Sequence, residues 1–251
     1  MTFEDIVRHV GTVPHMPPDR GKLIYEFIRT IRPEAVLELG FAHGTSSCYI
    51  AAAMEANGKG KLLTIDHKRA LDREPNISAL LEKTGLDSFV EARFCERSYT
   101  WELLKLLEAH TREGRTEPAF EFVFIDGGHT WDSDGFSFLL ADRLLKPNGW
   151  ILFDDVLWTP SMMEGEAWVR EMPEEERDVA HVEKILSLLV IPDGKYHNME
   201  FDGTWAWVQK KGDQTSLEDR SDLVKKMYAH TKSSRSAYLF RRYLKRLFRL
   251  S

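Results

Sequence analysis

The stretch "AVLELGFAHGTSSCYIAAAM", residues 35–54, passes from a short apolar strand through a glycine loop into a helix. The strand ends at Gly40, and the helix begins after Gly44. Glycine lets the backbone approach a ligand closely, and a helix N-terminus offers unpaired N–H groups. The stretch therefore predicts an α/β fold whose first loop can hold a ligand.

The same alternation of strand and helix continues along the chain. We expect further strands at 61–65, 89–94, 120–125 and 150–153, a turn at 146–149, and helices at 19–31, 78–86, 101–110 and 136–145. Such alternation implies parallel strands joined by right-handed crossovers. The last two strands, 196–201 and 204–209, flank Asp202-Gly203, which is a two-residue hairpin signal. The prediction is a Rossmann-like, doubly wound α/β sheet of seven strands, mostly parallel, ending in an antiparallel hairpin.

Charge is distributed unevenly between the body of the chain and its end. Nine of the 34 basic residues follow Asp222, whereas none of the 40 acidic residues does, so residues 1–222 carry a net charge of −15. An acidic body is a poor nucleic-acid binder, because phosphate contacts need clustered bases. Two cysteines, no signal-peptide pattern and no long apolar run predict a cytoplasmic protein. We expect an N-terminal helical cap at 1–34, a core at 35–210, and a linker with a C-terminal helix at 211–251.

The C-terminal segment "SAYLFRRYLKRLFRL" has apolar residues at helical spacing opposite arginine and lysine. A basic amphipathic helix of this kind suits an anionic membrane surface, which would place the protein peripherally on the inner membrane surface. It equally suits docking on the acidic body of the same chain or on a second subunit of a homo-oligomer.

The glycine loop and an acidic residue after the second strand suggest a nucleoside ligand. Asp66 lies where a carboxylate can accept both hydroxyls of a ribose. The spacing of Gly40 and Gly44 fits neither a dinucleotide fingerprint nor a phosphate loop, which leaves a nucleoside such as S-adenosylmethionine. The alternative is a simple chain reversal with Asp66 as a solvated loop residue, but loop and acid together favour the nucleoside.

Three carboxylates follow the fourth and fifth strands. Asp126 ends the fourth strand, and Asp154 and Asp155 end the fifth, so the parallel sheet should place them on one edge. Converging carboxylates repel one another unless a cation lies among them, and oxygen ligands suit Mg²⁺, Mn²⁺ or Ca²⁺. His129 follows a glycine pair and can reach that edge as a general base for a metal-bound hydroxyl. The alternative is that these acids cap helices and His129 lies on the surface.

Four segments together give the sequence a resemblance to class I S-adenosylmethionine-dependent methyltransferases. These are "VLELGFAHGTS", "LLTIDH", "FVFIDGGHTWD" and "LLKPNGWILFDDV", and the resemblance covers roughly residues 35 to 210. Within the class, the chain is similar to metal-dependent O-methyltransferases, which implies metal ligation by Asp126, Asp154 and Asp155. Catechol-type members have Asp-Asn and a lysine base where this chain has Asp154-Asp155 and His129. Those departures resemble macrolide-sugar O-methyltransferases and cephalosporin-hydroxylase-like proteins.

The resemblance implies methyl transfer from S-adenosylmethionine to a hydroxyl of a sugar, glycoside or related small molecule. Mg²⁺ would chelate the hydroxyl and His129 would remove its proton. Glu38, Gly40 and Gly44 would hold the amino acid end of the cofactor, Asp66 the ribose, and Ser98 would lie near the adenine. Asp126 would also be among the residues that bind the cofactor.

Two rival functions remain open at this point. A hydroxylase of the non-haem iron type would bind its iron through two histidines and one carboxylate. His129 would be the first histidine, and His43 is the candidate for the second. A non-catalytic S-adenosylmethionine-binding protein would bind the nucleoside without turnover.

Overall fold

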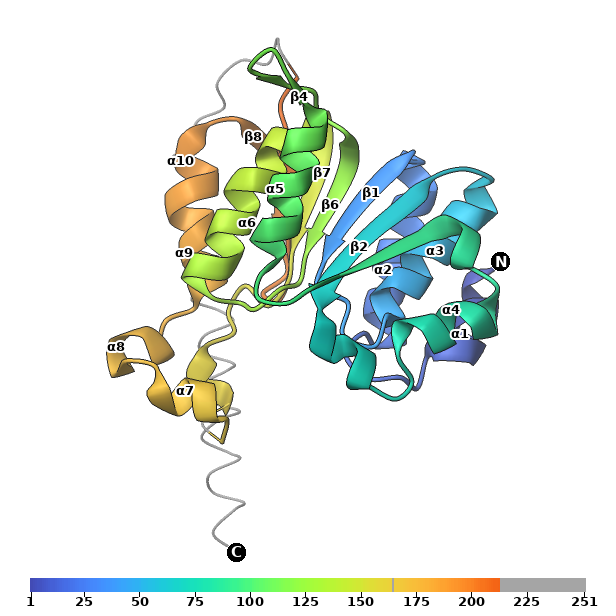
Figure 1. The fold of residues 1–251 in the computed structure, drawn as a ribbon, viewed down its shortest axis with the longest axis horizontal. Coiled ribbons are helices and arrows are strands. Elements are labelled where there is room, and N and C mark those ends of the chain that lie inside the picture. Colours follow the sequence, from blue (N-terminus) through green and yellow to red (C-terminus); the bar gives the residue numbers. More distant parts are fainter. Residues whose placement is uncertain (164, 213–251) are drawn as a thin grey trace, which may run out of the picture.

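The computed structural model describes residues 1–163 and 165–212, which form a sheet covered by helices on both faces (Figure 1). The seven strands run in the order β3-β2-β1-β6-β7-β9-β8. They are β1 (Ala35–Leu39), β2 (Lys61–His67), β3 (Val90–Cys95), β6 (Phe120–Ile125), β7 (Leu145–Phe153), β8 (Tyr196–Phe201) and β9 (Ala206–Lys210). Pairing is parallel from β3 to β7 and antiparallel for β9 with both β7 and β8. The predicted fold is confirmed. The predicted C-terminal helix lies outside the described residues.

Two helical layers bury the two faces of this sheet (Figure 1). On one face lie α1 (Phe3–Val10), α2 (Pro18–Ile31), α3 (Thr45–Asn57) and α4 (Ile77–Thr84). On the other lie α5 (Tyr99–His110), α6 (Trp131–Leu144), α9 (His181–Ile185), the π-helical turn η4 (Leu186–Val190) and α10 (Ile191–Asp193). The central strands are buried on both faces, which explains their almost continuous apolar sequences. No helix in the described part is long and apolar enough to cross a membrane.

Short elements join these layers. They are the 3₁₀ turns η1 (Lys68–Asp72), η2 (Asp87–Phe89) and η3 (Pro160–Met163), the two-stranded hairpin β4 (Thr111–Arg112) with β5 (Arg115–Thr116), and helices α7 (Ala167–Glu171) and α8 (Glu174–Arg177). The segment that contains α7 and α8 projects beyond the two helical layers (Figure 1).

Two local expectations differ from the structure. The predicted turn at 146–149 lies inside β7 as a bulge, because Phe120 pairs with Leu145 while Phe122 pairs with Trp150. The predicted two-residue hairpin is a four-residue loop, since Phe201 pairs with Ala206. Within this loop the Asp202 carboxylate accepts from the N–H of residues 204 and 205, which holds the turn closed without a two-residue geometry.

Candidate active site

The carboxyl ends of β1, β6 and β7 bring the predicted acidic side chains to one cavity. These strands are neighbours, and the ladder continues past their ends: Asp126 N–H donates to Leu39 O at 2.8 Å, and Asp154 N–H donates to Ile125 O at 3.0 Å. Asp126, Asp154, Asp155 and His129 all line a cavity of about 580 Å³. The parallel sheet therefore places them on one edge.

His129 lies against two of the three carboxylates. Its Nε2 is 3.8 Å from Asp126 Oδ1 and 3.5 Å from Asp155 Oδ2. Its Nδ1 is buried and makes no hydrogen bond to any residue that the structure describes. His129 and Asp155 both have left-handed backbone, with φ of 52° and 51°. Such conformations cost roughly 1–3 kcal/mol each and persist only where the surroundings fix them.

Asp134, in the first turn of α6, fixes the turn that carries His129. Its carboxylate accepts from Gly128 N–H at 3.1 Å and from His129 N–H at 2.9 Å. Burial raises the pKa of Asp134, which is only 1% exposed. A Cβ on Gly127 would lie 2.5 Å from Asp134 Oδ1, so the turn requires glycine there. Sequence reasoning missed Asp134, although an acid in the first turn of a helix is a recognisable signal.

The negative charges of Asp126, Asp154 and Asp155 repel one another in this cavity. Burial, and then the charges of Asp154 and Asp155, raise the pKa of Asp126 well above its usual range. Burial and the Asp155 charge raise the pKa of Asp154 to about 6. Two donors oppose this rise: Trp205 Nε1–H at 2.7 Å and Asp155 N–H at 2.6 Å both donate to Asp154 Oδ1. The cluster therefore favours a bound proton or cation over three free negative charges.

The glycine loop lies directly against the turn after β6. Gly40 has φ of 85°, and a Cβ there would lie 1.8 Å from Asp126 O. Gly40 also lines the cavity. Gly44 has a different reason to be glycine: its φ is 94°, and a Cβ would lie 2.7 Å from Ile77 Cγ1. Gly44 is not among the residues that line the cavity.

Asp66 lines the cavity and also holds the glycine loop. Its Oδ2 accepts from Phe41 N–H at 2.9 Å and from Ala42 N–H at 2.7 Å. Asp66 Oδ1 also accepts from His67 N–H at 2.5 Å, so of the roughly four acceptor sites of a carboxylate, one remains for a ligand hydroxyl. Ser98, the other residue expected near the nucleoside, caps α5 by accepting from Thr100 N–H at 3.2 Å and does not line this cavity.

Glu38 is fully buried beneath the loop. Its Oε2 accepts from Thr64 Oγ1–H at 2.6 Å and from the hydroxyl of Ser47. Its Oε1 is buried and has no hydrogen-bond partner within the described part of the chain. Burial raises the pKa of Glu38 to about 7. The side chain is thus a buried acceptor with one unused oxygen.

Three basic residues also line the cavity: His15 and Arg20 from the N-terminal region, and Arg73 from the turn after η1. Arg20 lies over the Trp205 ring at 4.8 Å and pairs with Asp202. Arg73 Nη1 lies 3.2 Å from His15 Nε2, and burial followed by the Arg73 charge lowers the pKa of His15. His15 and Arg20 belong to the predicted N-terminal cap, whereas sequence reasoning gave Arg73 no role.

The candidate second histidine of a hydroxylase lies elsewhere. His43 stacks on His15 with centroids 5.5 Å apart, and its Nδ1 is 2.6 Å from Pro75 O. It does not line the cavity that contains His129. The ring beside His129 is instead Trp158, with centroids 5.4 Å apart. In residues 1–163 and 165–212, no group of three or more His, Cys, Asp or Glu side chains is arranged to hold a metal ion.

Comparison with known proteins places this fold in one class. Residues 37–156 match the family model described as "Methyltransferase domain". The structure resembles the O-methyltransferase from Bacillus cereus in complex with SAH, with a TM-score of 0.57 and 16% identity, over 83% of this chain and 90% of that one. It also resembles TomG, an O-methyltransferase from Streptomyces achromogenes in complex with SAM, with a TM-score of 0.54 and 20% identity, over 84% and 88%. These likenesses show the class I methyltransferase fold.

This match confirms the resemblance to class I S-adenosylmethionine-dependent methyltransferases that the sequence indicates. A caffeoyl-CoA O-methyltransferase of Stellaria longipes is 28% identical over 143 residues, 56% of this chain and 54% of that protein. A catechol O-methyltransferase of Niastella koreensis is 29% identical over 140 residues, 56% of this chain and 57% of that protein. The chain thus spans little more than half the length of these two curated relatives.

Proposed function

We propose that this chain transfers a methyl group from S-adenosylmethionine to a hydroxyl of a sugar, glycoside or related natural product. The transfer would depend on a divalent cation, for which the oxygen ligands suit Mg²⁺, and His129 would act as general base. The observation that carries the proposal is a single cavity lined both by Gly40 and Asp66 and by His129 with the three carboxylates.

The residues present fit the cofactor. Glu38 offers a buried oxygen without a partner, which an ammonium group such as that of the cofactor would satisfy. Asp66 retains acceptor capacity for one ribose hydroxyl and lines the cavity beside the glycine loop. Two solved O-methyltransferase structures with the same fold hold SAM and SAH, respectively.

The donor set fits a hard divalent cation. Asp126, Asp154 and Asp155 supply oxygen only, and their mutual repulsion is the penalty that a cation would relieve. When bound, the cation would lower the pKa of a hydroxyl that it chelates. Asp126 and Asp155 share His129 as a neighbour, which brings two of the three carboxylates to one side chain.

The proton would pass to His129. Its Nε2 faces the carboxylates, so this nitrogen would accept the acceptor's hydroxyl proton as the oxygen attacks the methyl group. The Asp134 carboxylate would keep the His129 backbone in place, and Trp158 would shield the ring from water. The departures from catechol-type members at Asp154-Asp155 and His129 support an alcohol of a sugar over a catechol as the acceptor.

The test begins with calorimetric titration of S-adenosylhomocysteine into the full chain. A panel of glycosides and catechols is then screened for release of S-adenosylhomocysteine from S-adenosylmethionine, with EDTA and after restoring Mg²⁺. His129→Gln should bind the cofactor normally and lose 10²-fold or more in turnover, as expected for a general base. Turnover that survives complete chelation would contradict the cation, and a hydroxylated product would favour the rival hydroxylase. Binding without turnover on any acceptor would favour the non-catalytic rival.

A further inference from the structure

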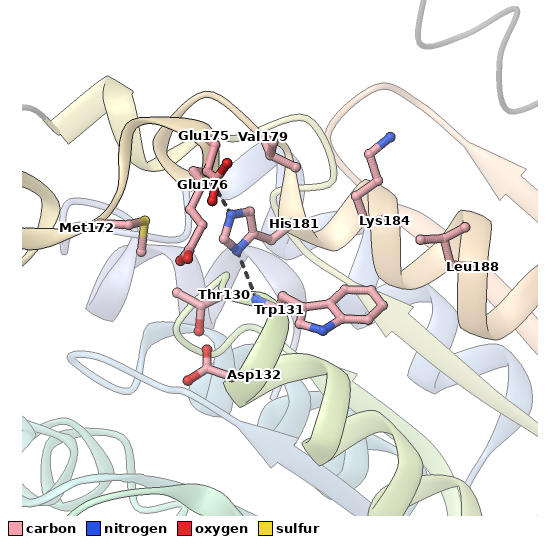
Figure 2. Close-up of a pocket in the computed structure, with 10 residues that line it drawn as sticks. All are labelled: Thr130, Trp131, Asp132, Met172, Glu175, Glu176, Val179, His181, Lys184 and Leu188. Atoms are coloured by element: carbon pink, nitrogen blue, oxygen red, sulfur yellow. Dashed lines mark hydrogen bonds between the residues drawn. The ribbon is translucent and has the colours of Figure 1, made fainter.

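A second cavity lies beside the catalytic one, at the N-terminus of α6 (Figure 2). Its volume is about 710 Å³, and it is lined by the first residues of α6 and by the 172–188 segment. Thr130 lines this cavity, whereas His129, the preceding residue, lines the catalytic cavity. Consecutive residues of one turn therefore face two neighbouring cavities.

The walls of this second cavity are apolar. Trp131 is 43% exposed and Leu188 is 58% exposed, and Met172 and Val179 complete the apolar lining. Large apolar side chains that gather at one exposed place mark a binding surface more often than isolated ones do. Trp131 offers a broad face on which a ring can stack.

His181 holds the two walls together, as Figure 2 shows. It is 5% exposed, its Nδ1 accepts from Trp131 N–H at 2.9 Å, and its Nε2 lies 2.9 Å from Glu176 O. Because Nδ1 accepts, Nε2 carries the proton and donates to that carbonyl. One buried ring thus connects α6 to the 172–188 segment, so the cavity is formed before any ligand arrives.

The charge at this cavity is negative. Three carboxylates line it, those of Asp132, Glu175 and Glu176, and none has an ion-pair partner among the residues described. The one basic residue in the lining, Lys184, pairs with Glu183 at 2.9 Å. A hydrogen bond from Thr130 lowers the pKa of Asp132, so this carboxylate stays ionised at neutral pH.

We propose that this second cavity binds a ring-bearing, protonated amine, as the distal part of the acceptor whose hydroxyl reaches His129. The inference rests on the proposed function for the identity of the acceptor. The apolar walls would bury the ring, and the carboxylates at the rim would attract the ammonium group. The same charges would repel an anionic acceptor such as a CoA thioester, in contrast to the relatives named for caffeoyl-CoA.

The test compares three fragments of one shape on the full chain: phenethylamine, 2-phenylethanol and 3-phenylpropanoate. Ligand-observed NMR should rank the amine above the alcohol and the alcohol above the carboxylate. The double variant E175Q/E176Q should weaken amine binding about three- to tenfold and leave alcohol binding unchanged. Its matched control is E82Q/E108Q, which neutralises two exposed carboxylates outside the cavity. Leu188→Ala should weaken binding of both amine and alcohol. Leu139→Ala, at an exposed leucine of α6 outside the cavity, should weaken neither.

The outcome separates this proposal from the proposed function. Equal binding of the three fragments, or amine binding that E175Q/E176Q leaves intact, overturns the proposal. Calorimetric binding of S-adenosylhomocysteine to the same variants tests the cofactor site independently and should not change. Once an acceptor has been identified, E175Q/E176Q should raise KM for an acceptor that carries an amine and leave kcat unchanged. KM for the neutral analogue should not change.

Discussion

Replacement of Glu38 by glutamine should change how the stability of the protein depends on pH. Burial raises the pKa of Glu38 from an ordinary 4.5 to about 7, so the folded state holds a proton that the unfolded state releases between these values. The free energy of unfolding must therefore fall as pH rises from about 4.5 through about 7. At about 1.4 kcal/mol per pH unit, the full effect is about 3 kcal/mol, most of which lies between pH 5 and pH 8.

Urea unfolding at these two pH values, followed by circular dichroism, measures the effect. Glutamine keeps an acceptor for Thr64 and Ser47 but cannot ionise, so the wild type should lose about 2–3 kcal/mol more than Glu38→Gln between pH 5 and pH 8. Other titrating groups are common to both proteins and cancel in the comparison. The exposed Glu82→Gln is the control and should follow the wild type. Parallel pH dependence of wild type and Glu38→Gln would refute the reasoning.

Saturating S-adenosylhomocysteine extends the same measurement to the cofactor site. If its ammonium group lies at Glu38, ionised Glu38 gains a partner, and the pH-dependent loss of stability should shrink in the wild type alone. A loss that is the same with and without the ligand would contradict the assignment of Glu38 to the cofactor.

Three further substitutions test the geometry of the site. Gly40→Ala should lower the free energy of unfolding in urea by more than about 3 kcal/mol, because the added Cβ would meet Asp126 O and φ at this position is positive. A stable variant that still binds the cofactor would contradict this close approach. Trp205→Phe removes a donor to Asp154 and should lower the free energy of unfolding by about 1–3 kcal/mol at neutral pH, and by less at pH 5, where Asp154 is protonated. His181→Phe should speed amide hydrogen exchange in residues 172–185 without changing affinity for S-adenosylhomocysteine; unchanged exchange would show that the ring does not hold the two walls.

The sequence predicts those features of the site that follow from sheet topology. Asp126 and Asp154 end adjacent parallel strands, and the rule that such ends share an edge is enough to bring them together. The helices at 181–193 were not predicted, because they are broken into short pieces with a π-turn and lack the long periodicity that predicts a helix.

Supporting contacts depend on distances that no local pattern contains. Trp205 reaches Asp154 across 51 residues, from a loop whose closure depends on the hydrogen bonds of Asp202. The prediction of a two-residue hairpin fails at the same loop. Asp202-Gly203 indicates a turn, but it does not indicate that Trp205 is buried and that the loop must be longer. Asp134 is nearer to His129 in sequence, yet its role depends on how the turn between them folds.

The contact between Gly40 and Asp126 has a consequence for the order of binding. The loop of the expected cofactor site rests on the main chain of a residue in the expected cation site, without space for even a methyl group between them. A displacement of one backbone must move the other, so occupation of either site should alter affinity at the other. Thermodynamic linkage then requires the same factor in both directions: whatever cofactor does to cation affinity, cation must do to cofactor affinity.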